Sequence, residues 1–251
     1  MEKFVCREND SEWKLERLWN LQENKQKSSI QSTAFVDGIL YVFYHDSIIQ
    51  QYVQGTLEDE YSPTSGVIHH ANDTEYDGKD FIIVDTGTKD ILPMLKRYDP
   101  KRHVVLQEWN ILSPGWRTAA ASFTVDKELL VIMVEAIALE KRTKMSLRTF
   151  NLSSDKTVEI ASLPHWHKYV QGCAVRGNEL FITTNDGGSS EKTRFIDYDL
   201  RQKKIIHDVS FEGFGESEGM FCTADGHLLT GRNMRNGKSA VYRLVTPGEM
   251  A

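Results

Sequence analysis

The sequence has 251 residues, which suits one large all-β domain or two small ones. The 30 Lys and Arg residues against 36 Asp and Glu give a net charge of −6, which repels a phosphate backbone and excludes nucleic acid as the expected partner. With 40% hydrophobic and 26% charged residues, the composition is typical of a folded, water-soluble protein without long disordered stretches.

The chain shows no sequence signal for export or for a membrane span. The first 14 residues contain no apolar run of signal-peptide length, and the longest apolar stretch, residues 129–139, is interrupted by Glu135. The cysteines Cys6, Cys173 and Cys222 are too few and too scattered for a disulfide framework or a zinc knuckle. We therefore expect no membrane partner and favour a cytoplasmic location, although a chain trimmed of its leader would look the same.

In chain order, the first recurring element is a short apolar strand, a turn pair and a second apolar run. Its five copies lie near residues 32–44, 72–85, 119–134, 171–184 and 218–231. The turn residues, spaced 40, 49, 50 and 49 positions apart, are Asp37, Asp77, Asp126, Arg176 and Asp225. Gly follows in four of the five copies and supplies the positive φ that a tight hairpin turn needs. Each copy therefore predicts a β-hairpin.

A second recurring element follows the first and has the pattern of an outer hairpin. It consists of an aromatic residue, Asp or Asn, a polar turn and an alternating strand, as in residues 97–109, 149–161 and 197–209. The aromatic residues recur at intervals of 46, 52, 48 and 44: Tyr52, Tyr98, Phe150, Tyr198 and Tyr242. Two markers on different residues thus share one period.

Four antiparallel strands every 40 to 50 residues are typical of the blades of a propeller. The sequence predicts an all-β fold, a five-bladed β-propeller with four antiparallel strands per blade, as a single domain over residues 1–251. A β-sandwich is the alternative, and it should show irregular strand spacing.

The ring closure is predicted from the two ends of the sequence. The last copy contains only three strands, the third near residues 240–245, so its fourth strand must come from elsewhere. Residues 11–21 alternate like an outer strand and are predicted to complete the last blade. The segment KFVC, residues 3–6, also resembles a third strand, which leaves the strand allocation at the closure open.

The last hairpin carries a resemblance to known propellers. Its sequence ESEGMFCTADGHLL, residues 216–229, is similar to the inner strands of NHL and SMP30-like propellers. The resemblance implies an architecture that lactonases, glycosidases, lectins and scaffolds share, so it implies a fold and no single activity.

Polar residues at the starts of the inner strands are the candidate site, because these segments meet at one rim of a propeller channel. The ligand-binding candidates are His70, Asn72, Asp73, Trp116, Arg117, His167, Tyr169, Gln171, Glu216 and Glu218. The first copy offers only Gln31, Ser32 and Thr33. The alternative interpretation is that such side chains satisfy buried backbone groups and hydrate the channel.

The same residues include the candidates for catalysis. Asp73 and Glu218 are the one carboxylate pair that the repeat places across the channel for acid and base chemistry. A divalent cation could use His70 or His167 with these carboxylates, but no HExxH spacing occurs, so neither a metal nor another cofactor is predicted. No GxSxG motif supports a nucleophile.

The sequence favours a monomeric, ligand-binding β-propeller that recognises a small polar molecule or glycan at the channel rim. A metal-dependent or carboxylate-based hydrolase or lactonase, and a protein-interaction scaffold, are the alternatives, so enzymatic activity is left open. Truncating Asp73 and Glu218 together is expected to abolish ligand binding and to leave folding intact.

Overall fold

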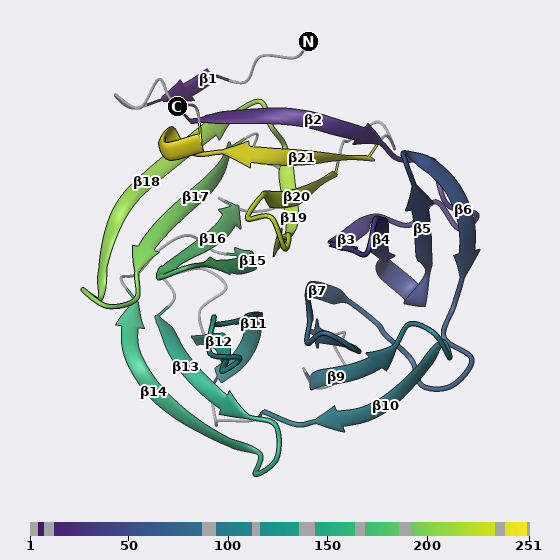
Figure 1. The fold of residues 1–251 in the computed structure, drawn as a ribbon, viewed down its shortest axis with the longest axis horizontal. Helices are drawn as coiled ribbons and strands as arrows, with labels where there is room; N and C mark the ends of the chain where they lie inside the picture. The colour runs from purple at the N-terminus through teal and green to yellow at the C-terminus, as the bar shows by residue number, and fades with distance from the viewer. Residues whose placement is uncertain are drawn as a thin grey trace.

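The computed structural model describes residues 5–7, 13–86, 94–111, 116–135, 144–163, 169–185, 192–233 and 239–249. In these residues, five antiparallel sheets stand around a central axis (Figure 1). The prediction of a five-bladed β-propeller is confirmed. No helix in the described part of the chain has the length and apolar character needed to cross a membrane.

The strands of each blade run outward from the axis. Blade 1 holds β3 (Ile30–Val36), β4 (Ile39–Tyr44), β5 (Ile49–Val53) and β6 (Thr56–Tyr61). Blade 2 holds β7 (Ala71–Tyr76), β8 (Phe81–Asp85), β9 (Met94–Asp99) and β10 (Val104–Trp109). Blade 3 holds β11 (Trp116–Phe123), β12 (Leu129–Glu135), β13 (Met145–Asn151) and β14 (Lys156–Leu163).

The last two blades contain the strands that close the ring. Blade 4 holds β15 (Tyr169–Arg176), β16 (Glu179–Asn185), β17 (Lys192–Asp199), β18 (Lys204–Glu212) and an added β1 (Val5–Arg7). Blade 5 holds β19 (Glu216–Cys222), β20 (Leu228–Asn233), β21 (Ser239–Val245) and β2 (Lys14–Asn20). Two short 3-10 helices are η1 (His45–Ser47) and η2 (Pro247–Glu249).

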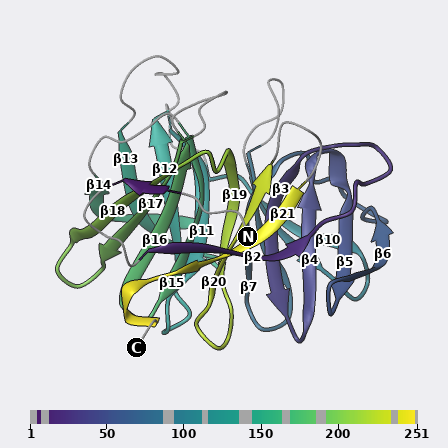
Figure 2. The same ribbon diagram turned by 90° about the horizontal axis from the view of Figure 1, so that it is seen from above.

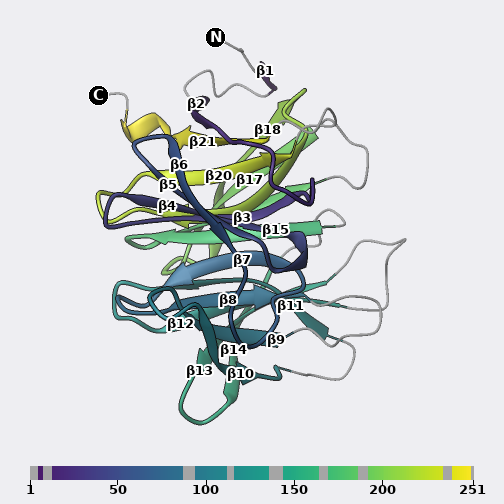
Figure 3. The same cartoon turned by 90° about the vertical axis from the view of Figure 1, so that its right-hand side faces the viewer.

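The ring closes through the strand predicted at residues 11–21. Strand β2 pairs antiparallel with β21 and completes blade 5, while β1 pairs with β18 and adds a fifth strand to blade 4 (Figure 3). The third strand of blade 5 is β21, so KFVC does not take that place. Two segments from the start of the sequence therefore hold two neighbouring blades.

The hydrophobic core lies in wedges between adjacent blades. Each of five buried clusters joins two neighbours, and the cluster between blades 5 and 1 has the same character as the other four. One aromatic residue on each third strand enters a different wedge: Tyr52, Tyr98, Phe150, Tyr198 and Tyr242. The aromatic period of the sequence thus follows from one interface per blade.

The inner hairpin turns all lie on one face of the ring, because the inner strands run along the axis in the same direction (Figure 2). We call it the turn face and the opposite face, where the inner strands begin, the mouth face. At the first turn both Asp37 and Gly38 have positive φ, at 52° and 81°. In the third copy Lys127 adopts φ of 61° where the other copies have Gly.

Candidate functional site

Strand β7 lies near the propeller axis and contacts the inner strands of all four other blades. Its residues 71–75 are all buried, although four of the five are polar. Buried polar groups need hydrogen-bond partners, and those of β7 lie in the other four blades.

The carboxylate of Asp73 joins three other blades through backbone hydrogen bonds. Oδ2 accepts the N–H of Ala121 at 3.1 Å and of Cys173 at 2.9 Å, and Oδ1 accepts the N–H of Met220 at 3.1 Å. Burial raises the pKa of Asp73 to about 8, opposed by these N–H donors and that of Thr74. With both oxygens occupied by backbone groups, Asp73 is placed as a structural centre.

The neighbours of Asp73 extend these connections. Asn72 Nδ2 donates to the carbonyl oxygens of Ala119 at 2.7 Å and Val170 at 3.1 Å. The hydroxyl oxygens of Thr74 and Ser32 lie 2.7 Å apart, which links β7 to blade 1. Polar side chains of β7 thus bind every other blade, and this role fits the alternative interpretation of backbone satisfaction.

Glycine allows the inner strands to meet close to the axis. A Cβ on Gly172 would lie 2.4 Å from the backbone N of Met220, and one on Gly219 would lie 2.7 Å from Cα of Ser32. Strand β19 therefore approaches both β15 and β3 closely here, and β7 contacts all three strands.

Two carboxyl groups of β19 lie at the mouth. Glu216 is exposed and Glu218 is only 2% exposed, and their side chains hydrogen-bond to each other. Burial first, and then the charge of Glu216, raise the pKa of Glu218 well above its ordinary value. Burial beside a second carboxyl group therefore favours the protonated form of Glu218.

Amide side chains donate hydrogen bonds to both carboxyl groups. Gln171 Nε2 donates to Glu216 at 3.1 Å, and Asn233 Nδ2 donates to Glu218 at 2.8 Å and to the Ile30 carbonyl at 3.0 Å. Gln31 Nε2 donates to the same carbonyl at 3.0 Å, while its buried Oε1 has no hydrogen-bond partner among the described residues. We call Gln31, Gln171, Glu216, Glu218 and Asn233 the mouth cluster.

A β-bulge in every inner strand explains why these amides gather at the mouth. The pairing of each inner strand with its neighbour shifts once, and the extra residues are Gln31, Asn72, Ala119, Gln171 and the pair Gly219 and Met220. A bulge redirects side chains and bends its strand. Sequence reasoning undervalued Gln31, because a register shift leaves no reliable mark in one sequence. It missed Asn233 because this residue ends the second strand β20, opposite Glu216, whereas the candidates come from the starts of the inner strands.

The remaining predicted residues lie around the cluster in different settings. Burial, followed by the charge of His45, lowers the pKa of His70 to about 4, and the two rings lie 5.3 Å apart. Trp116 is half-buried beneath the guanidinium of Arg148, 5.5 Å from the ring centroid. Arg117 and Tyr169 are exposed.

Some of the predicted site cannot be placed. His167 lies outside the described residues. Within the described ranges, no group of three or more His, Cys, Asp or Glu side chains is arranged to hold a metal ion. The chemistry assembled at the mouth is therefore that of a buried carboxyl group with a raised pKa, an exposed carboxyl group and amides, which together donate and accept hydrogen bonds.

Comparisons with known proteins support the fold alone. No protein-family model matches the sequence, and no curated protein matches it. A glucose dehydrogenase-like oxidoreductase structure from Thermus thermophilus matches with a TM-score of 0.54 and 13% identity, covering 93% of this chain and all of that one.

Two further structures are propellers of longer chains. The WD40 β-propeller domain of Doa1 has a TM-score of 0.47 at 10% identity, and the match covers 84% of this chain and 62% of that one. The Dos1 propeller has a TM-score of 0.43 at 13% identity, with coverage of 88% and 57%. This chain thus spans about three fifths of the length of those two, and at such identities no activity transfers.

Proposed function

We propose that this propeller binds a small polar molecule, such as one sugar unit of a glycan, at the channel mouth. The observation that carries the proposal is the pair of carboxyl groups on Glu216 and Glu218, held by amides from blades 4 and 5. A raised-pKa acid beside an exposed carboxylate is characteristic of functional sites. The pair lies on β19, and Glu216 is exposed at the start of this strand, on the mouth face.

The ligand class follows from the hydrogen-bonding groups at the mouth. A sugar hydroxyl both donates and accepts, so it complements a carboxylate that accepts and amides that donate. Tyr169 is 39% exposed at the start of β15, two residues before Gln171, and offers an aromatic face for stacking against a sugar ring. Trp116, at the start of β11, is the second aromatic candidate.

The test is a binding screen of mono- and oligosaccharides on a glycan array, followed by titration of the strongest binder into Glu216→Gln. Removing a charged hydrogen-bond acceptor should weaken binding by about 10-fold or more. Glu128→Gln, an exposed change with the same effect on net charge, is the control and should bind normally. Equal affinity of both variants, or no binder on the array, would contradict the proposal.

A carboxylate-based hydrolase is the second candidate, now with Glu216 and Glu218 in place of Asp73 and Glu218. The proton on Glu218 suits a general acid and the Glu216 carboxylate suits a base. Mass spectrometry of each bound sugar separates the two functions, because cleavage indicates turnover.

The scaffold alternative finds no comparable support in the described surface. The exposed large apolar side chains on the strands of the outer surface are spread one to a blade: Val53, Leu106, Val158, Ile206 and Leu18. A docking surface for a protein would be expected to gather them in one patch.

A further inference from the structure

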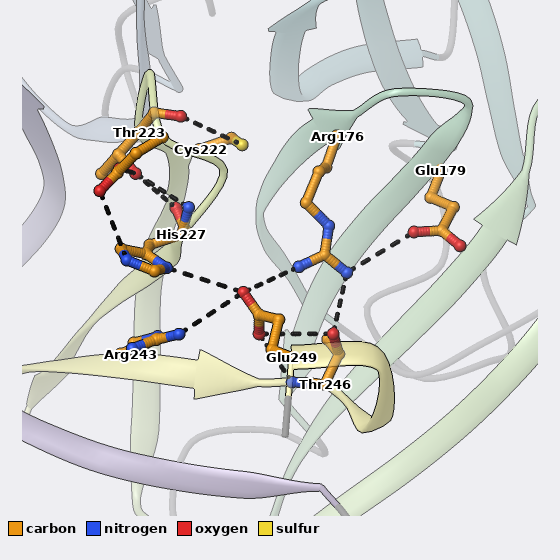
Figure 4. A network of polar contacts seen from close by, with 9 residues as sticks. Arg176, Glu179, Cys222, Thr223, His227, Arg243, Thr246 and Glu249 are labelled. Carbon is orange, nitrogen blue, oxygen red and sulfur yellow. Dashed lines mark hydrogen bonds and ion pairs between the residues drawn. The ribbon is translucent and has the colours of Figure 1, made fainter. Parts of the chain in front are cut away.

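On the turn face, opposite the mouth, three basic side chains surround one carboxylate (Figure 4). Oε1 of Glu249 lies 3.2 Å from Nη1 of Arg176, 3.7 Å from Nη2 of Arg243 and 3.7 Å from Nδ1 of His227. Oε2 accepts the backbone N–H of Thr246 at 2.9 Å. We call Arg176, His227 and Arg243 the basic cluster, and residues 246–249 the closing turn.

The basic cluster is assembled from separate elements of two blades. Arg176 ends β15 in blade 4, whereas Arg243 lies on β21 and His227 follows the inner hairpin turn in blade 5. Glu249 belongs to η2, which follows β21. The contact therefore crosses the wedge between blades 4 and 5.

Arg176 is held in place by groups other than Glu249. Its guanidinium lies 4.8 Å from the ring centroid of Phe181, and Nη2 donates to the Thr246 hydroxyl at 2.9 Å. The same Nη2 lies 3.6 Å from Glu179, which is 40% exposed. A cation fixed by stacking and a second ion pair is preorganised to receive an anion.

The carboxylate does not use all the donors around it. Nε of Arg243 and Nδ1 of His227 are buried and make no hydrogen bond with any described residue. Three basic groups also approach the same oxygen of Glu249. Two more carboxylates lie beside the cluster, Glu179 at 3.6 Å from Arg176 and Asp225 at 3.4 Å from Nε2 of His227, so the cluster has no excess of positive charge. What Glu249 leaves unsatisfied is the buried N–H of Arg243 Nε and, in the tautomer that carries its proton there, that of His227 Nδ1, and buried donors without acceptors are unfavourable.

We propose that the basic cluster is an oxyanion-binding site that Glu249 fills from within the same chain. The site takes a carboxylate, or a phosphate group whose additional oxygens can accept from the unused donors. The closing turn acts as a tethered ligand whose effective concentration is high, so free anions compete poorly while Glu249 is in place. Moving the turn away opens the site on the turn face.

The test is chemical rescue in the full chain. Glu249→Ala should lower the Tm, and sodium acetate or sodium phosphate should raise it again by about 2–4 °C with saturation, compared with sodium chloride at equal ionic strength. Acetate replaces the missing carboxylate, and a larger effect of phosphate would identify the unused donors as part of the site. Glu249→Gln, which keeps the side-chain size, is the second variant if Glu249→Ala does not fold.

Two controls decide the result. Glu179→Ala removes a carboxylate whose ion pair within the described ranges is with Arg176, and it should show no anion rescue. Adding Arg243→Gln to Glu249→Ala should abolish the rescue. The proposal is overturned if acetate and phosphate affect Glu249→Ala no more than chloride does, if Glu179→Ala is rescued equally, or if the rescue survives Arg243→Gln.

Discussion

Asp73 shows how one side chain can hold a ring of blades together. Its carboxylate accepts backbone N–H groups from β11, β15 and β19, and no other described side chain replaces it there. An acid in an inner strand looks catalytic in a sequence, because sequence does not tell whether its oxygens face backbone donors or a substrate. We therefore no longer expect truncation of Asp73 to leave folding intact.

Removing the Asp73 carboxylate should destabilise the protein strongly. Asp73→Ala leaves buried N–H groups without an acceptor, at about 1–3 kcal/mol each, so the free energy of unfolding should fall by more than about 3 kcal/mol. Urea denaturation measures this loss. Asp126→Ala, at an exposed turn, should change the value by less than about 0.5 kcal/mol, and a similarly small effect at Asp73 would refute the structural role.

Glu218 makes the stability of the protein depend on pH. Its pKa is raised above the ordinary 4.5, so the folded protein holds the proton more tightly than the unfolded chain. The stabilisation is fully present below the ordinary pKa and is lost as pH rises through the raised pKa. Asp73 and Glu75, whose pKa values are also raised by burial, act in the same direction.

Glu218→Gln should remove this one contribution. The amide still accepts from Asn233 and donates to Glu216, but it cannot ionise. Urea denaturation over a pH series should show the variant gaining stability relative to the natural protein as pH rises. Parallel pH profiles for the two proteins would mean that Glu218 is not the proton carrier.

At the scale of elements, β2 joins the start of the sequence to blade 5, and two leucines on it report this packing. Leu15 is 8% exposed in the wedge between blades 4 and 5, whereas Leu18 is 39% exposed. Leu15→Ala should lower the free energy of unfolding by about 2–5 kcal/mol, and Leu18→Ala by less than about 1 kcal/mol. Equal losses in urea denaturation would argue against the observed docking of β2.

The hairpins could be predicted from the sequence because turn residues and alternation are local signals. The predicted copy near 171–184 corresponds to β15 and β16, over Tyr169–Arg176 and Glu179–Asn185. The bulges could not be predicted, since they arise from pairing between strands. The sequence placed Glu216 and Glu218 at the mouth, but it did not indicate Asn233 on the second strand β20 or the contacts of β7 with every other blade.

At the scale of the whole molecule, five equivalent hydrophobic wedges between the blades form a ring, and its two faces carry different polar groups. Strand β7 contacts the inner strands of the other four blades, the mouth face presents a carboxyl pair, and the turn face carries the basic cluster. The aromatic period predicted this ring because each wedge needs one buried aromatic residue, such as Tyr242 between blades 4 and 5. The sequence placed the polar starts of the inner strands at one rim, but no pattern in it indicated the basic cluster on the opposite face.

The most direct test of the binding site is a crystal structure of the protein grown with the sugar that binds most strongly on the array. We predict density for the sugar at the mouth face, within hydrogen-bond distance of Glu216 and against the ring of Tyr169. Density on the turn face or between the outer strands, with an empty mouth, would contradict the account.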